Sequence, residues 1–158
     1  MLDGADRMLT MNTLRTALIV SFLLGITSNH AFATEWWSGF AMGTSEYTVT
    51  DDKGNELYIA CPSEDGEYVR ATATIAGTRY SSQQGDGFNV IVDGYTNTNP
   101  FDTYCRLCGE DFPNFWDSLR NASTLQVSAG GQTVKLPTTN IGVLPVLGDP
   151  ENTCQSAW

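Results

Sequence analysis

Alternating apolar and polar residues dominate residues 34–158, and this two-residue period is typical of β-strands with one buried face. Between Val69 and Ile75 every second residue is apolar. The segment Asp51–Asn55 interrupts two such runs, and glycines at 130 and 131 interrupt two more, so each pair of runs predicts a β-hairpin. Roughly seven to nine short strands at this spacing predict a mainly β fold, an antiparallel β-sandwich or small β-barrel.

One segment follows a helical period instead. Its apolar residues recur at three- and four-residue spacing, as expected for one face of a helix. They are Phe112, Phe115, Trp116 and Leu119. Pro113 suits the first turn of a helix, where the amide hydrogen that proline lacks has no partner in the helix. We therefore predict one short helix over residues 113–121, with its apolar face packed on the sheet.

The N-terminal part of the chain has the features of a signal peptide. Arg15 precedes an apolar run at 17–26, and Ala31-Phe32-Ala33 fits the small-residue pattern of a cleavage site. A run of about ten residues is too short to span a bilayer, which needs about 20. We expect cleavage after Ala33, no stable membrane anchor, a periplasmic or secreted bacterial protein, and a single β-rich domain at residues 34–158.

Loss of residues 1–33 would also remove the only histidine, His30. A Ser-His-Asp triad, a Cys-His pair and histidine metal ligands would then be excluded, which favours a protein that is not an enzyme and has no metal or other cofactor. The segment carries two basic and two acidic residues, so the net charge of −10 is unchanged by its removal. Such an acidic chain is expected to repel nucleic acids and to attract a cationic protein.

Cys105 and Cys108 form a Cys-x-x-Cys motif that admits three interpretations: a redox pair, two metal ligands, or part of a disulfide framework. A redox pair of the thioredoxin type lies at the start of a helix, where the helix dipole lowers the pKa of the first thiol. Here the helix is predicted to begin only at Pro113, and Glu110 and Asp111 oppose a thiolate. The sequence therefore favours structural disulfides.

The four cysteines allow three pairings, and the sequence alone does not select one. We expect a local Cys105–Cys108 bridge and a long Cys61–Cys154 bridge that ties the first half of the domain to its C-terminal end. The long bridge would contribute on the order of 4 kcal/mol by restricting the unfolded chain.

The order of elements resembles the invasion-associated locus B family of exported bacterial proteins. The features that carry this resemblance are Trp36-Trp37, a strand that ends at Cys61, the turn "PSEDGEY" at 62–68, the element "FWDSLRNASTLQV" at 115–127 followed by "VKLP", and Cys154. The resemblance implies a role in interaction with host cells, and it implies no catalytic residues.

A second resemblance concerns one loop. The stretch "AGTRYSS" at 76–82 is similar to the Ser-Gly-x-x-Tyr loop of the membrane-bound and periplasmic C-type lysozyme inhibitors. Gly77 and Tyr80 match that loop, which implies a binding role for both, whereas Ala76 occupies the position of the inhibitory serine. The sequence thus predicts an exported, non-catalytic binding protein whose partner is a cationic host factor or lysozyme. The alternatives are a periplasmic lysozyme inhibitor and a thiol–disulfide redox protein that uses Cys105 and Cys108.

Overall fold

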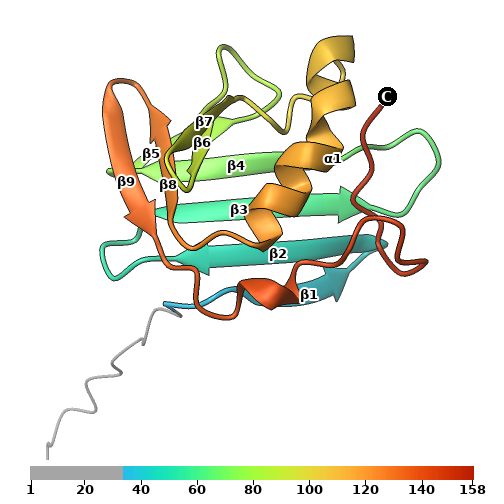
Figure 1. Cartoon of the computed structure of the whole chain (residues 1–158), viewed down its shortest axis with the longest axis horizontal. Helices are drawn as coiled ribbons and strands as arrows, with labels where there is room; N and C mark the ends of the chain where they lie inside the picture. The colour runs from blue at the N-terminus through green and yellow to red at the C-terminus, as the bar shows by residue number, and fades with distance from the viewer. Residues whose placement is uncertain (1–33) are drawn as a thin grey trace, which may run out of the picture. The chain divides into compact units, whose positions relative to one another are not determined.

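The computed structural model describes residues 34–158, and the predicted signal peptide lies outside the described residues. Two antiparallel sheets and one long helix make up the domain (Figure 1). The five-stranded sheet contains β1 (Trp37–Ala41), β2 (Thr44–Thr50), β3 (Glu56–Pro62), β4 (Arg70–Ile75) and β5 (Thr78–Ser81), in that order. The four-stranded sheet, in spatial order, contains β7 (Tyr95–Thr98), β6 (Asn89–Val92), β8 (Leu125–Ala129) and β9 (Gln132–Leu136).

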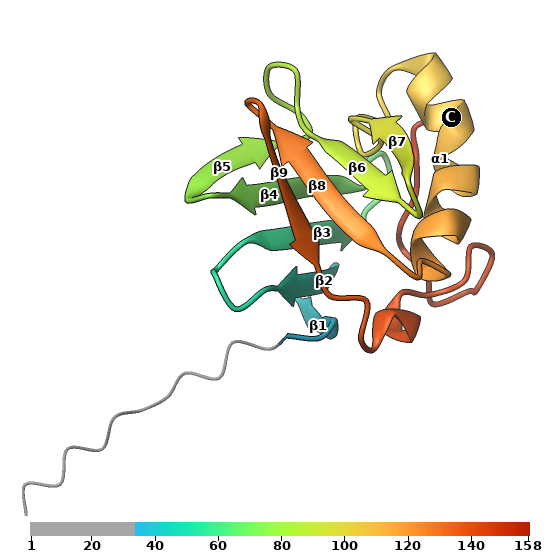
Figure 2. The same cartoon turned by 60° about the vertical axis from the view of Figure 1, so that its left-hand side comes forward.

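The remaining elements are the helix α1 (Arg106–Arg120) and a short 3₁₀ helix, η1 (Ile141–Val143). Both α1 and the four-stranded sheet lie on the same face of the five-stranded sheet (Figures 1 and 2). None of the helices in residues 34–158 is long and apolar enough to cross a bilayer. The prediction of a mainly β sandwich with one helix is confirmed, and the two sheets do not close into a barrel.

The core lies between the sheets and the helix, where the apolar positions of the alternating runs meet. Along β4, Ala71, Ala73 and Ile75 are at most 2% exposed, while the intervening side chains point away from the core. The predicted apolar face of the helix is buried as well, and Trp116 packs edge-on against Tyr47 of β2 at 6.4 Å between ring centroids. These burials confirm both the two-residue period of the strands and the helical period of residues 112–119.

The helix is longer than predicted, because it begins at Arg106 and not at Pro113. Contacts made by its first turns stabilise this extension. Nε of Arg106 lies 2.9 Å from Oε1 of Glu110, and the Arg106 guanidinium lies over the ring of Trp158. A Cβ at Gly109 would lie 2.7 Å from Cδ1 of Trp158, so glycine at this position lets the indole pack directly on the helix. These contacts involve residues outside the local pattern from which the helix start was predicted.

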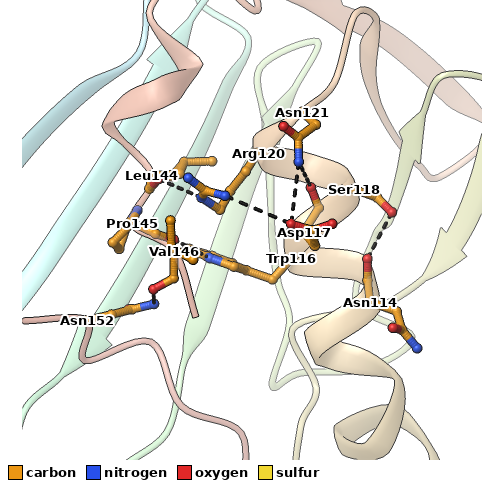
Figure 3. A network of polar contacts seen from close by, with 10 residues as sticks. All are labelled: Asn114, Trp116, Asp117, Ser118, Arg120, Asn121, Leu144, Pro145, Val146 and Asn152. Carbon is orange, nitrogen blue, oxygen red and sulfur yellow. Dashed lines mark hydrogen bonds and ion pairs between the residues drawn. The ribbon is translucent and has the colours of Figure 1, made fainter. Parts of the chain in front are cut away.

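The other end of the helix is hydrogen-bonded to the segment after η1 (Figure 3). Nε1 of Trp116 donates to the carbonyl oxygen of Pro145 at 2.9 Å, and Nε of Arg120 donates to that of Leu144 at 2.8 Å. Leu144 itself is fully buried. Because buried carbonyl groups need hydrogen-bond partners, these two donors fix the C-terminal segment against α1.

A disulfide between Cys61 and Cys154 attaches the same C-terminal segment to the end of β3, as predicted. Two hydrogen bonds accompany the disulfide: Oγ1 of Thr153 donates to the carbonyl oxygen of Cys61 at 2.7 Å, and the amide of Val69 donates to that of Gln155 at 2.8 Å. The C-terminal segment is therefore held by covalent and polar contacts to the first sheet as well as by α1.

Candidate functional site

The Cys-x-x-Cys motif lies at the N-terminus of α1. Cys105 is the N-cap residue and Cys108 belongs to the first helical turn. Both are free thiols in the structure, so the expected Cys105–Cys108 bridge is absent, and the prediction that places the motif before the helix is wrong. The physical reason is the earlier helix start at Arg106. The earlier helix start removes one of the two reasons against a redox pair, and the acidic residues Glu110 and Asp111 remain the other.

The Cys105 thiol is exposed, and its pKa is lowered. The largest cause is a hydrogen bond from the Cys108 thiol to the Cys105 sulfur, and the amide of Cys108 adds to it. The amide of Leu107 has a smaller effect in the same direction, whereas the negative charge of Asp102 opposes the thiolate.

The Cys108 thiol is half-buried, and its pKa is raised to about 11. Its hydrogen bond to Cys105 is the largest cause, because a thiol that donates a hydrogen bond resists losing its proton. Burial and the negative charges of Cys105 and Asp102 raise the pKa further. The first thiol is thus suited to attack a substrate, and the second is suited to remain protonated until a bond to Cys105 must be broken.

Exposed apolar side chains surround the two thiols. Tyr104, Leu107 and Trp158 are each more than half exposed. The indole Nε1 of Trp158 donates to the carbonyl oxygen of Tyr104 at 3.3 Å, and Tyr104 stacks edge-on against Tyr68. Large exposed apolar side chains next to a reactive group are available to contact a partner molecule.

A pocket of about 380 Å³ adjoins Cys108, between α1 and β7. Figure 2 shows β7 at the edge of its sheet beside the helix. The side chains that line the pocket are mainly apolar or hydroxyl-bearing, and they include Thr96, Thr98, Pro100, Cys108, Phe112 and Phe115. Pocket-forming residues from β7 were not identified from the sequence, since nothing in residues 95–98 indicates proximity to the motif.

Gly77 and Tyr80, the predicted binding residues, occupy different parts of the β4–β5 hairpin. Gly77 lies in the exposed turn with φ of +81°, a backbone conformation that favours glycine. Tyr80 lies within β5 opposite Ala73; it is half-buried, and its hydroxyl lies against Gly130. The structure therefore places only Gly77 at the tip of the hairpin, and a binding role for either residue stays a prediction.

The acidic turn Asp51–Asn55 serves to join two hairpins. The carboxylate of Asp51 accepts hydrogen bonds from the amides of Lys53 and Asn55, both at 2.8 Å, and from Nδ2 of Asn55 at 2.7 Å. Oδ1 of Asn55 accepts from the amide of Ala76 in the β4–β5 turn. Within residues 34–158, no cluster of three or more His, Cys, Asp or Glu side chains is arranged to hold a metal ion.

We expect Asp51→Ala to lower the free energy of unfolding by about 1–3 kcal/mol at pH 7, because buried donors lose their acceptor. Burial favours the neutral acid, but the hydrogen bonds of Asn55 and Lys53 outweigh it, so the pKa of Asp51 is lowered. This stabilisation is present above the ordinary Asp pKa of about 3.9 and is lost as the pH falls through the lower folded value.

Denaturant titrations at pH 7 and pH 3 measure this effect, and the difference between Asp51→Ala and the unaltered protein should shrink at the lower pH. The exposed neighbour provides the matched control, since Asp52→Ala should change stability by less than about 0.5 kcal/mol. Equal effects of the two substitutions would contradict a structural role for Asp51.

Comparison with known proteins places the chain in a family. The YfjT family model matches residues 34–144, which include both sheets and α1. No curated protein and no solved structure matches the chain. The family match does not bear on the invasion-associated locus B or lysozyme-inhibitor resemblances, which stay predictions. Since the match covers more than half of the chain, this protein belongs to the YfjT family.

Proposed function

We propose that the protein is a thiol–disulfide redox protein in which Cys105 attacks and Cys108 resolves. The observation that carries this proposal is the asymmetry of the two thiols at the start of α1. Cys105 is exposed with a lowered pKa, whereas Cys108 is half-buried with a pKa raised to about 11. A helix N-terminus with an exposed, low-pKa first cysteine is the arrangement expected of a reactive thiol.

The reaction requires only a substrate disulfide. The Cys105 thiolate attacks one sulfur of that disulfide; a bond to Cys105 forms, the substrate S–S bond breaks, and the departing thiolate takes a proton from water. Cys108 then loses its proton and attacks the sulfur of Cys105, which forms the Cys105–Cys108 disulfide and releases the second substrate thiol. Two electrons pass from the protein to the substrate, and the reverse sequence oxidises a substrate dithiol.

The Cys61–Cys154 disulfide supports a location in an oxidising compartment, where thiol–disulfide exchange is useful. Structural disulfides persist in oxidising compartments, such as the bacterial periplasm and the extracellular space. This agrees with the export that the signal-peptide pattern predicts. The disulfide itself is nearly inaccessible to solvent, because Cys61 and Cys154 are at most 3% exposed, so it is not expected to take part in exchange.

Equilibration with reduced and oxidised glutathione tests the proposal. We expect the Cys105–Cys108 pair to interconvert between dithiol and disulfide with a midpoint in the range of about −120 to −270 mV that redox-active proteins occupy. We also expect the reduced protein to accelerate the reduction of insulin by dithiothreitol. A pair that stays oxidised below about −300 mV and leaves insulin reduction unchanged would be a structural disulfide, and the proposal would fail.

A second candidate, the exported binding protein predicted from the sequence, is favoured by a different surface. The edge strand β1 and the turn after it expose Trp37, Phe40 and Met42, which are 54%, 70% and 100% exposed. An exposed aromatic edge strand is suited to pairing with a partner protein, and the net charge of −10 would favour a cationic one. Lysozyme inhibition is the narrower form of this candidate, and the exposed tip at Gly77 is the feature that favours it.

A further inference from the structure

Given the redox function proposed above, we propose that its substrate is an extended polypeptide segment that pairs with the free edge of β7 and is mainly neutral or basic. The cysteine of this segment would then face Cys105, and a neighbouring side chain would enter the pocket beside Cys108.

The main-chain register of β7 leaves hydrogen-bonding groups free on the pocket side. A two-residue turn, Asp93-Gly94, joins β6 and β7, so the flanking residues Val92 and Tyr95 form a hydrogen-bonded pair. Because such pairs alternate along antiparallel strands, the amide and carbonyl groups of Thr96 and Thr98 point away from β6. Strand β7 is an edge strand, so no further strand of the domain pairs with these groups.

The position of the pocket links this edge to Cys108, whose thiol is hydrogen-bonded to the Cys105 sulfur. Thr96 and Thr98 line the same pocket of about 380 Å³ as Cys108. The pocket also contains the aromatic side chains of Phe112 and Phe115, and the exposed Leu107 extends its apolar surface. An extended peptide offers both features that such a site requires, main-chain groups for the edge and alternate side chains for the pocket.

Charge favours a polypeptide over glutathione as the occupant. Asp111 lines the pocket, and the negative charge of Asp102 opposes the Cys105 thiolate. The nearby cation, Arg106, is already paired with Glu110 and stacked on Trp158. Carboxylate-bearing glutathione is therefore repelled, whereas a segment that carries lysine or arginine is attracted.

The test compares two disulfide substrates of the same chemistry. Each reacts with the full domain, in which Cys105 and Cys108 are reduced. One probe is a peptide of alternating valine and lysine with a central cysteine, supplied as its mixed disulfide with 2-mercaptoethanol. The other is bis(2-hydroxyethyl) disulfide, which is neutral and lacks a main chain. We expect a rate constant at least tenfold larger for the peptide, as judged by formation of the Cys105–Cys108 disulfide.

A proline at the edge removes one donor from the free main chain. Thr96→Pro should lower the ratio of the peptide rate to the small-disulfide rate by about five- to tenfold, the size expected for one lost hydrogen bond and disturbed pairing. Thr133→Pro is the matched control, because Thr133 occupies the equivalent outward position on β9, the opposite edge of the same sheet, and the ratio should stay unchanged there.

Peptides methylated on alternate main-chain nitrogens repeat the test on the unaltered protein, so the result does not depend on the folding of Thr96→Pro. Methyl groups on the peptide nitrogens that face β7 should slow exchange, whereas methyl groups on the intervening nitrogens should not. Equal rates for the two disulfides would overturn the docking proposal alone. The same conclusion would follow if the rate ratio were unchanged in Thr96→Pro and the two methylation sets had equal effects. Failure of the unaltered protein to react with either disulfide would instead overturn the redox function on which it rests.

Discussion

Replacing both Cys61 and Cys154 with alanine is expected to lower the free energy of unfolding by about 4 kcal/mol. The bridge joins residues 93 positions apart, and the closed loop removes conformations from the unfolded chain. Single domains have stabilities of roughly 5–15 kcal/mol, so this loss is a large share of the total. The hydrogen bonds of Thr153 and Val69 would remain, but they alone would have to hold the C-terminal segment on β3.

Denaturant unfolding of the purified protein measures this loss. The matched control is the Cys105→Ala/Cys108→Ala variant. Its free energy of unfolding should differ by less than about 1 kcal/mol from that of the unaltered protein with Cys105 and Cys108 reduced, because those thiols are not in the core. A loss below about 1 kcal/mol in the Cys61→Ala/Cys154→Ala variant would show that the polar contacts suffice and that the bridge is not a major source of stability.

The reduced protein is expected to react with iodoacetamide at Cys105 at least about tenfold faster than at Cys108 at pH 8. With a pKa of about 11, only about one Cys108 thiol in a thousand is ionised at that pH. The higher intrinsic reactivity of a more basic thiolate offsets part of this difference, which is why the expected ratio is smaller. The Cys105 rate should rise with pH and level off below the pH at which an ordinary thiol does, because its pKa is lowered.

Mass spectrometry of the alkylated peptides over a range of pH resolves the two sites. Cys108→Ala removes the largest cause of the lowered pKa, so the Cys105 profile should move toward higher pH. Asp102→Asn should move it slightly in the opposite direction, because that carboxylate opposes the thiolate. Indistinguishable profiles for Cys105 and Cys108 in the unaltered protein would contradict the assignment of attacking and resolving roles.

The sandwich could be predicted from the sequence because several of its strands, β2, β4, β6 and β8, are half-buried and alternate. The apolar positions of β4 are buried as the two-residue period requires, and the helical spacing of Phe112 to Leu119 identifies the buried face of α1. The long Cys61–Cys154 disulfide belongs to one of the three pairings that four cysteines allow, and the sequence alone does not select among them. Local periodicity and turn residues therefore predict most of the fold.

The candidate site could not be predicted in the same way, because its decisive contacts are distant in sequence. Pro113 suits the first turn of a helix, yet two earlier turns are stabilised by the Arg106–Glu110 pair and the packing of Trp158 on Gly109. The error of seven residues in the predicted helix start moved the cysteines off the helix terminus and favoured a static bridge. One available signal was the Arg106–Glu110 spacing of four residues, which is that of an ion pair on a helix. The proximity of β7 to Cys108 has no such signal in the sequence.

Trapping of a mixed disulfide tests the redox account most directly. In Cys108→Ala the resolving thiol is missing, so reaction with bis(2-hydroxyethyl) disulfide should leave a stable hydroxyethylthio adduct on Cys105. In the unaltered protein the same adduct should be transient and give way to the Cys105–Cys108 disulfide. Peptide mapping by mass spectrometry distinguishes these products. Absence of an adduct on Cys105, or equally fast capture at Cys108 in Cys105→Ala, would contradict the account.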